Sequence, residues 1–420
     1  MFKDRKKLLE IGKDVLIVLL LVSAVVLGHA SGVLVLGRDS VLTPIAAARP
    51  ESSGVTAAAL PYAIAVVPDE YGGRFGLTHG EAAIAETFDR FSAALGEALG
   101  SSGTPEEVPA ERFAQALSGP GVYFDYLYPQ PLSLLACWLG TELTGDAGAH
   151  TARRICLAVE DDSLALYYVR ARSGETYRCD TALSASTISA RIREYTPNGA
   201  KLVGELTDDA ALDACTLLEE ELTALPQLSG TNPLRDTALA AQLPELFSLS
   251  GAARSYAEAE GTVYVENDAT LRVHATGEVY YRCMTEGPEL GGASASTQTV
   301  VEAARGFCQR GPGASCGAAR LGLSELRYDP EENSYSISFE YCADGVPVRL
   351  SDGPAVTLTV RNGFLTEAVL RYRCYTPTEE TVTPLPRPLA LAAVRSVGGG
   401  EPLLCYVDTR RDVMLQWTAA

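Results

Sequence analysis

Helical and strand-like spacings of apolar residues divide this chain into distinct elements. Across residues 84–99, apolar side chains recur every three or four positions, which predicts a helix with one buried face. The preceding Thr78-His-Gly-Glu81 has the spacing of a capping box, so the helix is expected to begin there, with His79 as part of the turn and not as a ligand. Further helices are predicted after Pro109 and at residues 132–139, 187–195, 208–225, 239–247, 297–310 and 389–395.

The prediction at residues 208–225 rests on a long apolar stripe. Leu212, Cys215, Leu218 and Leu222 have helical spacing and form one apolar face. The three consecutive glutamates that begin at Glu219 would point in successive directions around such a helix. They are therefore expected to face solvent and not to form an acid/base pair.

Strands are predicted where apolar and polar residues alternate. In residues 335–341 every second side chain is apolar, the pattern of a sheet with one buried face. Turns at Ser173-Gly174, Thr276-Gly277 and Asn362-Gly363 favour antiparallel pairing, so we expect an α+β fold of antiparallel sheets with covering helices. The predicted strands are residues 62–67, 121–128, 155–159, 164–169, 176–179, 262–266, 270–275, 279–283, 323–328, 335–341, 356–361, 364–375, 403–407 and 413–417.

One tripeptide, Tyr-Arg-Cys, occurs three times in similar surroundings. Tyr177-Arg178-Cys179, Tyr281-Arg282-Cys283 and Tyr372-Arg373-Cys374 each end the second strand of a predicted hairpin, and each precedes a predicted helix. Either duplication of a sheet-plus-helix module or convergent strand composition explains this pattern.

The apolar run at residues 15–36 contains a single ionisable side chain, His29. At about 1.5 Å per residue, a helix over this run rises roughly 33 Å and crosses a hydrocarbon core of about 30 Å. The basic flank before it places the N-terminus in the cytoplasm and the body outside it. A signal peptide cleaved before Ser31 is the alternative, but apolar residues 33–36 extend past that site and favour an uncleaved single-pass anchor.

The regions beyond this run divide by composition. A stalk rich in Ala, Ser and Pro follows the apolar run, and the segment LPQLSGTN is the best domain boundary in the body, so two α+β lobes are predicted. The predicted divisions are a cytoplasmic basic head at residues 1–14, a transmembrane helix at 15–36, a stalk at 37–60, an N-terminal lobe at 61–225 and a C-terminal lobe at 233–420, with the boundary at 225–232.

Charge and cysteine content narrow the function further. A net charge of −19 argues against nucleic acid or anionic lipid as a direct ligand. With 47% hydrophobic and 21% charged residues, the chain has material for two or three domains with hydrophobic cores.

Ten cysteines in an exported body permit disulfides, and Cys308 and Cys316 are the nearest pair. The sequence has no CxxC motif, so buried free thiols are an equal alternative.

The sequence carries no convincing catalytic or metal-binding motif. Gly313-Ala-Ser315-Cys-Gly317 matches the GxSxG pattern of hydrolases, but a predicted helix precedes it, a strand follows it and no histidine comes later in the chain. Asp161 and Asp162 lie in a predicted hairpin turn and are expected to face solvent and not to bind metal. We therefore predict no catalytic residue, no metal site and no cofactor.

The aromatic run Tyr123, Phe124, Tyr126 and Tyr128 has two interpretations. It lies in a segment with strong strand propensity, so packing of one face in the core is the favoured explanation. The alternative is a groove that binds a sugar or peptide.

The order of these parts resembles a known family. The points of likeness are residues 3–28 in the head and span, residues 121–128 followed by Pro-Leu-Ser-Leu-Leu, and the terminal Leu403-Leu-Cys-Tyr-Val with Leu415-Gln-Trp417. In these features the chain resembles the YycH/YycI regulators of Gram-positive bacteria, single-pass proteins associated with the WalK sensor histidine kinase, which controls cell-wall metabolism. That family has no active-site motif to transfer to this sequence.

The resemblance implies a regulatory membrane protein and not an enzyme. Its span and extracytoplasmic body would contact a sensor histidine kinase, and a second family member is a further candidate partner. The residues alone leave two other classes open, namely a passive exported binding module for a cell-envelope peptide or glycan and an exported hydrolase. In each case the body lies outside the cytoplasm and binds no nucleic acid.

Overall fold

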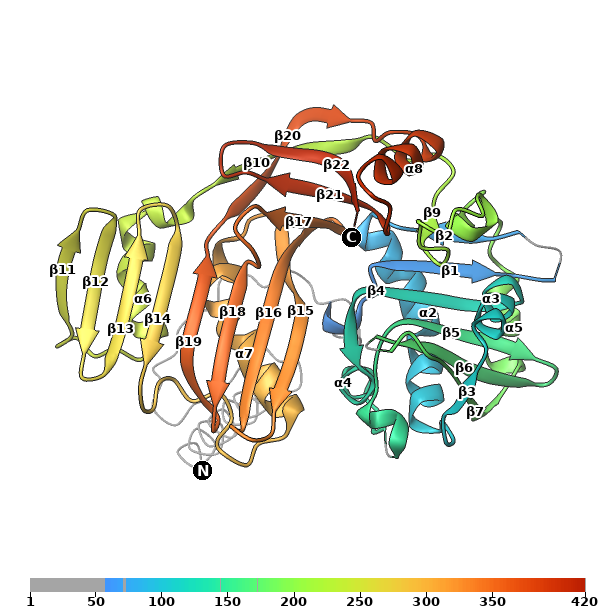
Figure 1. Ribbon diagram of the computed structural model, residues 1–420, viewed down its shortest axis with the longest axis horizontal. Helices are drawn as coiled ribbons and strands as arrows, with labels where there is room; N and C mark the ends of the chain where they lie inside the picture. Colours follow the sequence, from blue (N-terminus) through green and yellow to red (C-terminus); the bar gives the residue numbers. More distant parts are fainter. Residues whose placement is uncertain (1–56, 71–72, 144, 172, 420) are drawn as a thin grey trace, which may run out of the picture. The chain divides into compact units, whose positions relative to one another are not determined.

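Two large sheets and the helices that cover them make up the computed structural model, which describes residues 57–419 except 71–72, 144 and 172 (Figure 1). These residues belong to one compact unit, Gly54–Ala420. The predicted span at residues 15–36 and most of the stalk lie outside the described residues. Within the described part of the chain, no helix is long and apolar enough to cross a membrane. The predicted α+β fold with antiparallel sheets is confirmed.

Helices form at the predicted positions, with the exception of residues 208–225. They are α2 (Glu81–Gly100), α3 (Ala110–Ser118), α4 (Leu132–Trp138), α5 (Ser186–Ile192), α6 (Thr237–Leu246), α7 (Thr297–Arg310) and α8 (Arg387–Ser396), with short 3₁₀ turns at η1 (Ala57–Ala59), η2 (Asp146–Ala149), η3 (Val203–Glu205), η4 (Pro233–Arg235) and η5 (Pro312–Ser315).

The seven-stranded sheet has the order β2-β1-β4-β5-β6-β7-β3, and its neighbouring strands are antiparallel. Its strands are β1 (Ala63–Val67), β2 (Phe75–Leu77), β3 (Glu106–Val108), β4 (Gly121–Pro131), β5 (Thr151–Glu160), β6 (Ser163–Arg170) and β7 (Thr176–Ser184). On one face, Phe88 of α2 packs edge-on against Phe124 of β4, with 5.8 Å between the ring centroids. On the other face, Phe113 of α3 packs with Tyr123. The sheet is therefore covered by helices on both faces.

The eleven-stranded sheet has the path β11-β12-β13-β14-β19-β18-β16-β17-β21-β22, with β15 also paired to β16. Its strands are β11 (Arg254–Glu258), β12 (Gly261–Glu266), β13 (Ala269–His274), β14 (Glu278–Cys283), β15 (Ala319–Asp329), β16 (Ser334–Ala343), β17 (Val346–Leu350), β18 (Val356–Arg361), β19 (Phe364–Arg371), β21 (Pro402–Asp408) and β22 (Val413–Ala419). The pair β17–β21 is parallel and the other pairs are antiparallel.

Two helices pack on this larger sheet and bury its apolar positions. Phe247, directly after α6, stacks on Tyr281 of β14 with 4.5 Å between ring centroids. Phe307 of α7 meets Phe247 edge-on at 5.4 Å, and α7 lies behind β16 and β18 in Figure 1. The alternating residues of β16 that were predicted to face a core, including Ile337 and Phe339, are buried in the same hydrophobic cluster.

The prediction of a helix at residues 208–225 is wrong. Residues 208–216 form turns, and β9 (Leu217–Leu218) pairs with β8 (Lys201–Leu202). The carboxylates of Asp209 and Asp213 accept hydrogen bonds from the backbone N–H groups two residues later, at 3.1 and 3.0 Å. Such local bonds offer the backbone an alternative to helical hydrogen bonding. Glu219 consequently lies inward against His79, whereas the next two glutamates are exposed as predicted.

The capping box is also wrong, although α2 begins at the expected place. The helix is preceded by Gly80 in the left-handed conformation, with φ of 81°, which glycine adopts without strain. The hydroxyl and backbone N–H of Thr78 instead donate to Glu219 Oε1 at 2.9 and 2.6 Å. A distant turn caps the helix, because Asp344 accepts hydrogen bonds from the backbone N–H groups of Gly80 and Glu81, each at 3.0 Å.

The segment proposed as the boundary between lobes is itself a strand. Leu225–Thr231 forms β10, which pairs antiparallel with β20 (Cys374–Val382). One hydrophobic cluster includes side chains of α2 and α4 as well as side chains of α6, α7 and β16. The division into lobes at residues 61–225 and 233–420 stays a prediction.

Several strands were missed, namely β2, β3, β8, β9, β10, β11 and β17, and the cysteine prediction is resolved in part. All five residues of β11 are exposed, so this strand has no buried face to give it a period-two pattern, and β17 contains Pro347, a residue that argues against a strand in sequence-based prediction. Cys308 is a free thiol, so it is not bridged to Cys316. The other free thiols are Cys137, Cys156, Cys179, Cys215, Cys283, Cys342, Cys374 and Cys405.

Candidate functional site

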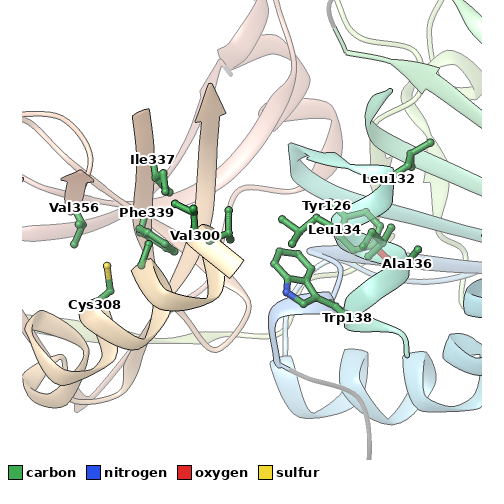
Figure 2. Close-up of a cluster of buried hydrophobic side chains, with 14 of the residues drawn as sticks. Tyr126, Leu132, Leu134, Ala136, Trp138, Val300, Cys308, Ile337, Phe339 and Val356 are labelled. Atoms are coloured by element: carbon green, nitrogen blue, oxygen red, sulfur yellow. The ribbon is translucent and has the colours of Figure 1, made fainter. Parts of the chain in front are cut away.

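A cavity of about 220 Å³ lies among segments that are distant in sequence. Its walls come from residues 57–62, from β4 and α4, and from α7, β15 and β16. Figure 2 shows Leu134 and Trp138 of α4 on one side of the neighbouring buried cluster, with Val300, Ile337 and Phe339 on the other side. The site therefore depends on how the seven-stranded and eleven-stranded sheets and their helices pack within this unit.

Most of the cavity wall is apolar and much of it is aromatic. Tyr126 and Tyr128 of β4, Trp138 of α4 and Phe339 of β16 contribute rings. The two interpretations of the aromatic run each hold for part of it. Tyr123 and Phe124 pack in the core against the sheet's covering helices, whereas Tyr126 and Tyr128 line the cavity. Concave sites of this composition are typical of small-molecule binding pockets.

The charged side chains in the wall balance one another. Two are acidic, Glu81 and Glu340, and two are basic, Arg305 and Arg320. Arg320 Nε donates to Glu81 Oε2 at 2.7 Å, which joins β15 to the first turn of α2. Arg305 pairs with Glu302 within α7 at 2.9 Å. Both lining arginines are therefore paired with carboxylates, whereas Glu340 accepts a hydrogen bond from the neutral hydroxyl of Tyr128.

Two further contacts connect the cavity walls. The hydroxyl of Tyr128 donates to the carboxylate of Glu340 on β16. Burial raises the pKa of Tyr128 and the carboxylate raises it further, so the phenol keeps its proton at neutral pH. On the α4 side, Trp138 Nε1 donates to Glu302 Oε1 at 2.6 Å, and Arg305 lies 5.9 Å from the indole ring. These bonds hold α4 and β4 against α7 and β16.

Two lining residues carry buried polar atoms that have no hydrogen-bond partner among the described residues. They are the hydroxyl of Tyr126 and Oε1 of Gln130. The amide Nε2 of Gln130 is occupied, since it donates to the carbonyl oxygens of Tyr128 and Leu323, each at 3.3 Å. Buried polar atoms are normally hydrogen-bonded, so unpaired atoms beside a cavity indicate where a bound molecule can supply a bond.

The unpaired hydroxyl gives a stability prediction. Tyr126→Phe is expected to stabilise the unliganded fold by about 1 kcal/mol, because it removes a desolvated hydroxyl that makes no bond and keeps the ring. The matched control is Tyr341→Phe, which should destabilise by about 1–2 kcal/mol, since the Tyr341 hydroxyl donates to Arg371 O and accepts from Arg373 N. Denaturant unfolding of both variants checks this prediction. A lower free energy of unfolding for Tyr126→Phe than for Tyr341→Phe would contradict it.

The thiols beside the cavity are not poised for nucleophilic chemistry. Burial raises the pKa of Cys342 to about 11, despite the opposing charge of Arg320. Burial likewise raises the pKa of Cys308. Both groups are thus protonated near neutral pH, whereas a reactive cysteine requires a lowered pKa. The arrangement is suited to binding and not to attack by a thiolate.

A buried ion cluster lies beside the entry segment, residues 57–62, which lines the cavity and leads into β1. Asp125 of β4 accepts from Arg153 Nε at 2.7 Å and from Arg154 Nε at 3.2 Å. Both arginines also pair with Glu401, which precedes β21. The backbone N–H of Tyr62 donates to the Asp125 carbonyl at 2.7 Å. The cluster therefore ties the entry segment, the seven-stranded sheet and the C-terminal strands together.

The residues considered for catalysis from sequence do not assemble into a site. Ser315 Oγ donates to Pro312 O at 3.4 Å, with α7 before it and β15 after it, as the sequence analysis expected. His79 lies against Glu219, with 3.1 Å between Nδ1 and Oε1, and is buried in the turn before α2. Asp161 and Asp162 are exposed in the β5–β6 turn. Among the described residues, no group of three His, Cys, Asp or Glu could hold a metal ion.

Sequence reasoning missed most of the cavity residues. Gln130 and Arg320 carry no motif, and they line the same cavity only because the fold brings β4 and β15 together. The aromatic run at Tyr126 and Tyr128 was the one available indication, and it was assigned mainly to the core. Sequence alone therefore pointed to one wall of the cavity and not to the cavity itself.

Comparisons with known proteins agree with the fold. No protein-family model matches the sequence, and no curated protein sequence matches it. The structure, however, is of the YycH type. It is similar to the crystal structure of YycH from Bacillus subtilis, with a TM-score of 0.57 at 10% sequence identity, covering 87% of this chain and 95% of that chain. The resemblance inferred from sequence is thus confirmed at the level of the fold.

Proposed function

We propose that this protein is a membrane-anchored, extracytoplasmic regulator of a sensor histidine kinase that controls cell-wall metabolism. The observation that carries the proposal is the YycH-type fold, which extends over most of both chains. The basic head and the apolar run at residues 15–36 support it independently, since together they predict a single span with the body outside. The span and the body are the proposed contacts with the kinase, and a second protein of the same fold is a further proposed partner.

The described part of the chain suggests how such a regulator would be built. The last residues of the predicted stalk include η1, which packs against α4, and the chain continues through residues 60–62 into β1. A change in the packing of this entry segment would be passed toward the span along the stalk. A regulator needs two arrangements with different effects on its partner, and an entry segment beside a cavity is a suitable place for that difference.

The experiment that tests the proposal alters the span without removing the anchor. Residues 15–36 are replaced by the same residues in scrambled order, which preserves length and hydropathy and changes only the helix surface. We expect loss of co-purification with the sensor kinase and a change of about fivefold or more in its target-gene output, the lower end of typical allosteric coupling. Membrane fractionation with an antibody to the body controls for anchoring.

A second arm removes residues 57–420 and keeps the head and span. If the scrambled span and the deletion both leave co-purification and gene output unchanged, the regulatory proposal fails. The cavity then favours the second candidate, a passive exported binding module, because such a module needs a binding site and a replaceable anchor. An exported hydrolase has no comparable supporting observation among the described residues.

A further inference from the structure

The cavity has features of a ligand site and a direct connection to the entry segment. Ala57, Ala58, Leu60 and Tyr62 line it together with residues of both sheets. This segment is the part of the body nearest in sequence to the predicted span. A molecule in the cavity would therefore touch the entry segment, β4 and β15 at once.

We propose that this cavity binds a small, neutral, mostly apolar molecule that carries one hydroxyl or amide N–H, and that its occupancy sets the packing of residues 57–62. The binding part stands on the cavity alone. The regulatory part, in which binding alters kinase output through the entry segment, rests on the proposed function.

The cavity volume sets the size of the molecule. An engineered apolar cavity of about 150 Å³ accommodates benzene, so by proportion a volume of about 220 Å³ accommodates roughly nine non-hydrogen atoms. This is the size of a substituted single ring or a short branched chain. The pocket is partly open to solvent, so an intact glycan or peptide would place only one group of this size in it.

The charges in the wall select a neutral molecule. Glu81 is paired with Arg320, and Glu340 accepts the hydroxyl of Tyr128. An anion would be desolvated on entry without an unpaired arginine to meet it, and a cation would meet only Glu340, whose carboxylate is already hydrogen-bonded to Tyr128; in both cases lost hydration costs free energy. A neutral molecule avoids that penalty and gains from burial of its apolar surface.

The unpaired polar atoms favour one hydrogen-bonding group on that molecule. Oε1 of Gln130 is an acceptor, and the hydroxyl of Tyr126 both donates and accepts. Protein atoms cover both groups, so a shift of either side chain toward the cavity would let it bond a hydroxyl or amide N–H on the bound molecule, which then replaces a bond that the protein leaves unmade. A molecule without such a group fills the space but leaves both atoms unpaired.

The binding test uses the full-length chain in detergent micelles and p-cresol as the probe, since it is neutral near pH 7, single-ringed and carries one hydroxyl. The chain has two tryptophans, and Trp138 lines the cavity. In a Trp417→Phe background the remaining fluorescence comes from Trp138. We expect saturable quenching by p-cresol, and a strictly linear response, like that of free tryptophan in the same micelles, would overturn the site.

A cavity-filling variant locates the binding. Gly322 lies on β15 opposite Glu340, and a Cβ atom added there has only Arg320 Nη1 within 4 Å, at an ordinary 3.6 Å. Gly322→Leu should therefore fold and fill the cavity, weakening p-cresol binding by roughly tenfold or more. The control is Gly251→Leu, where nothing lies within 4 Å of the added carbon. Equal binding by the two variants would overturn the assignment.

The chemistry is tested by comparing probes and by a second variant that keeps the fold. p-Cresol should bind more tightly than toluene, which lacks the hydroxyl, and far more tightly than 4-methylbenzoate, which is an anion. Tyr126→Phe, which retains the ring, should reduce the preference for p-cresol over toluene by about fivefold. Tighter binding of 4-methylbenzoate, or of toluene, to the unmutated chain would overturn the proposed selectivity.

The regulatory part has a separate readout. p-Cresol should change the kinase target-gene output in cells with the unmutated chain and should have no effect in cells with Gly322→Leu. If p-cresol binds but neither p-cresol nor the scrambled span changes output, the proposed function fails and the site stands. If the scrambled span changes output and no probe binds, the site fails and the proposed function stands.

Discussion

Replacement of Arg373 by glutamine is expected to destabilise the fold by about 3–5 kcal/mol, because it leaves the carboxylate of Asp408 buried without its countercharge. Asp408 is 0% exposed and Arg373 is 7% exposed. Arg373 Nε and Nη2 donate to the two carboxylate oxygens at 2.6 and 2.9 Å, and the Tyr375 hydroxyl donates to one of them at 2.9 Å. Denaturant unfolding of the full-length chain measures the loss, provided that the free energy of unfolding depends on denaturant concentration with the same slope in both proteins.

The chain supplies a matched control for this substitution. Arg282 occupies the middle of another Tyr-Arg-Cys tripeptide, but its side chain is 67% exposed and its ion pair with Glu367 is 3.3 Å long. Arg282→Gln should change stability by less than about 1 kcal/mol, as for most exposed ion pairs. The double variant Arg373→Gln with Asp408→Asn should recover part of the loss, because it removes the uncompensated charge. A loss below about 1 kcal/mol for Arg373→Gln alone would contradict the argument.

The three tripeptides also illustrate what a local pattern predicts. Each was expected at the end of a hairpin's second strand, and Arg178 and Arg282 do lie in strands, β7 and β14. Arg373 instead lies in the short gap between β19 and β20. The tripeptide gives no indication of burial, because burial depends on segments such as β21 that arrive from elsewhere in the chain.

Regular elements with one buried face were predictable, and segments that fold through local side-chain bonds were not. Residues 84–99 and 297–310 form helices because their apolar spacing is matched by a facing sheet. Residues 208–225 have the same spacing, but Asp209 and Asp213 accept hydrogen bonds from nearby backbone N–H groups. Leu212 and Leu218 pack in one cluster and Leu222 packs against another. The aspartates within this apolar pattern were the indication against a helix, because aspartate side chains bond nearby backbone groups and favour turns.

The cavity could not be derived from sequence because its walls share no local pattern. Its polar contacts join residues more than a hundred positions apart, such as Glu81 with Arg320 and Tyr128 with Glu340. In its local sequence, each of these residues occupies an ordinary helix or strand position. Only the packing of β4 and α4 against α7, β15 and β16 brings them together, and that packing is a property of the whole fold.

A second large effect is expected at the ion cluster beneath the entry segment. Burial by itself would raise the pKa of Asp125, but Arg153 and Arg154 outweigh it and hold that pKa at about 2, against an ordinary value of 3.8. A difference of this size corresponds to about 2–3 kcal/mol of stability at neutral pH. Asp125→Asn should therefore destabilise the chain by about that amount at pH 7, since both arginines lose a buried carboxylate.

The pH dependence of this loss has a definite sign. Because the folded-state pKa of Asp125 is lowered, its charge stabilises the fold fully above the pKa of the unfolded chain, and the contribution disappears as the pH falls through about 2. The stability difference between the unmutated chain and Asp125→Asn should therefore shrink as the pH is lowered from about 4 toward 2. Asp162→Asn, in the exposed β5–β6 turn, is the control and should show no such trend. A difference that stays constant with pH would mean that Asp125 acts through packing and neutral hydrogen bonds, and the electrostatic explanation of the cluster would then be wrong.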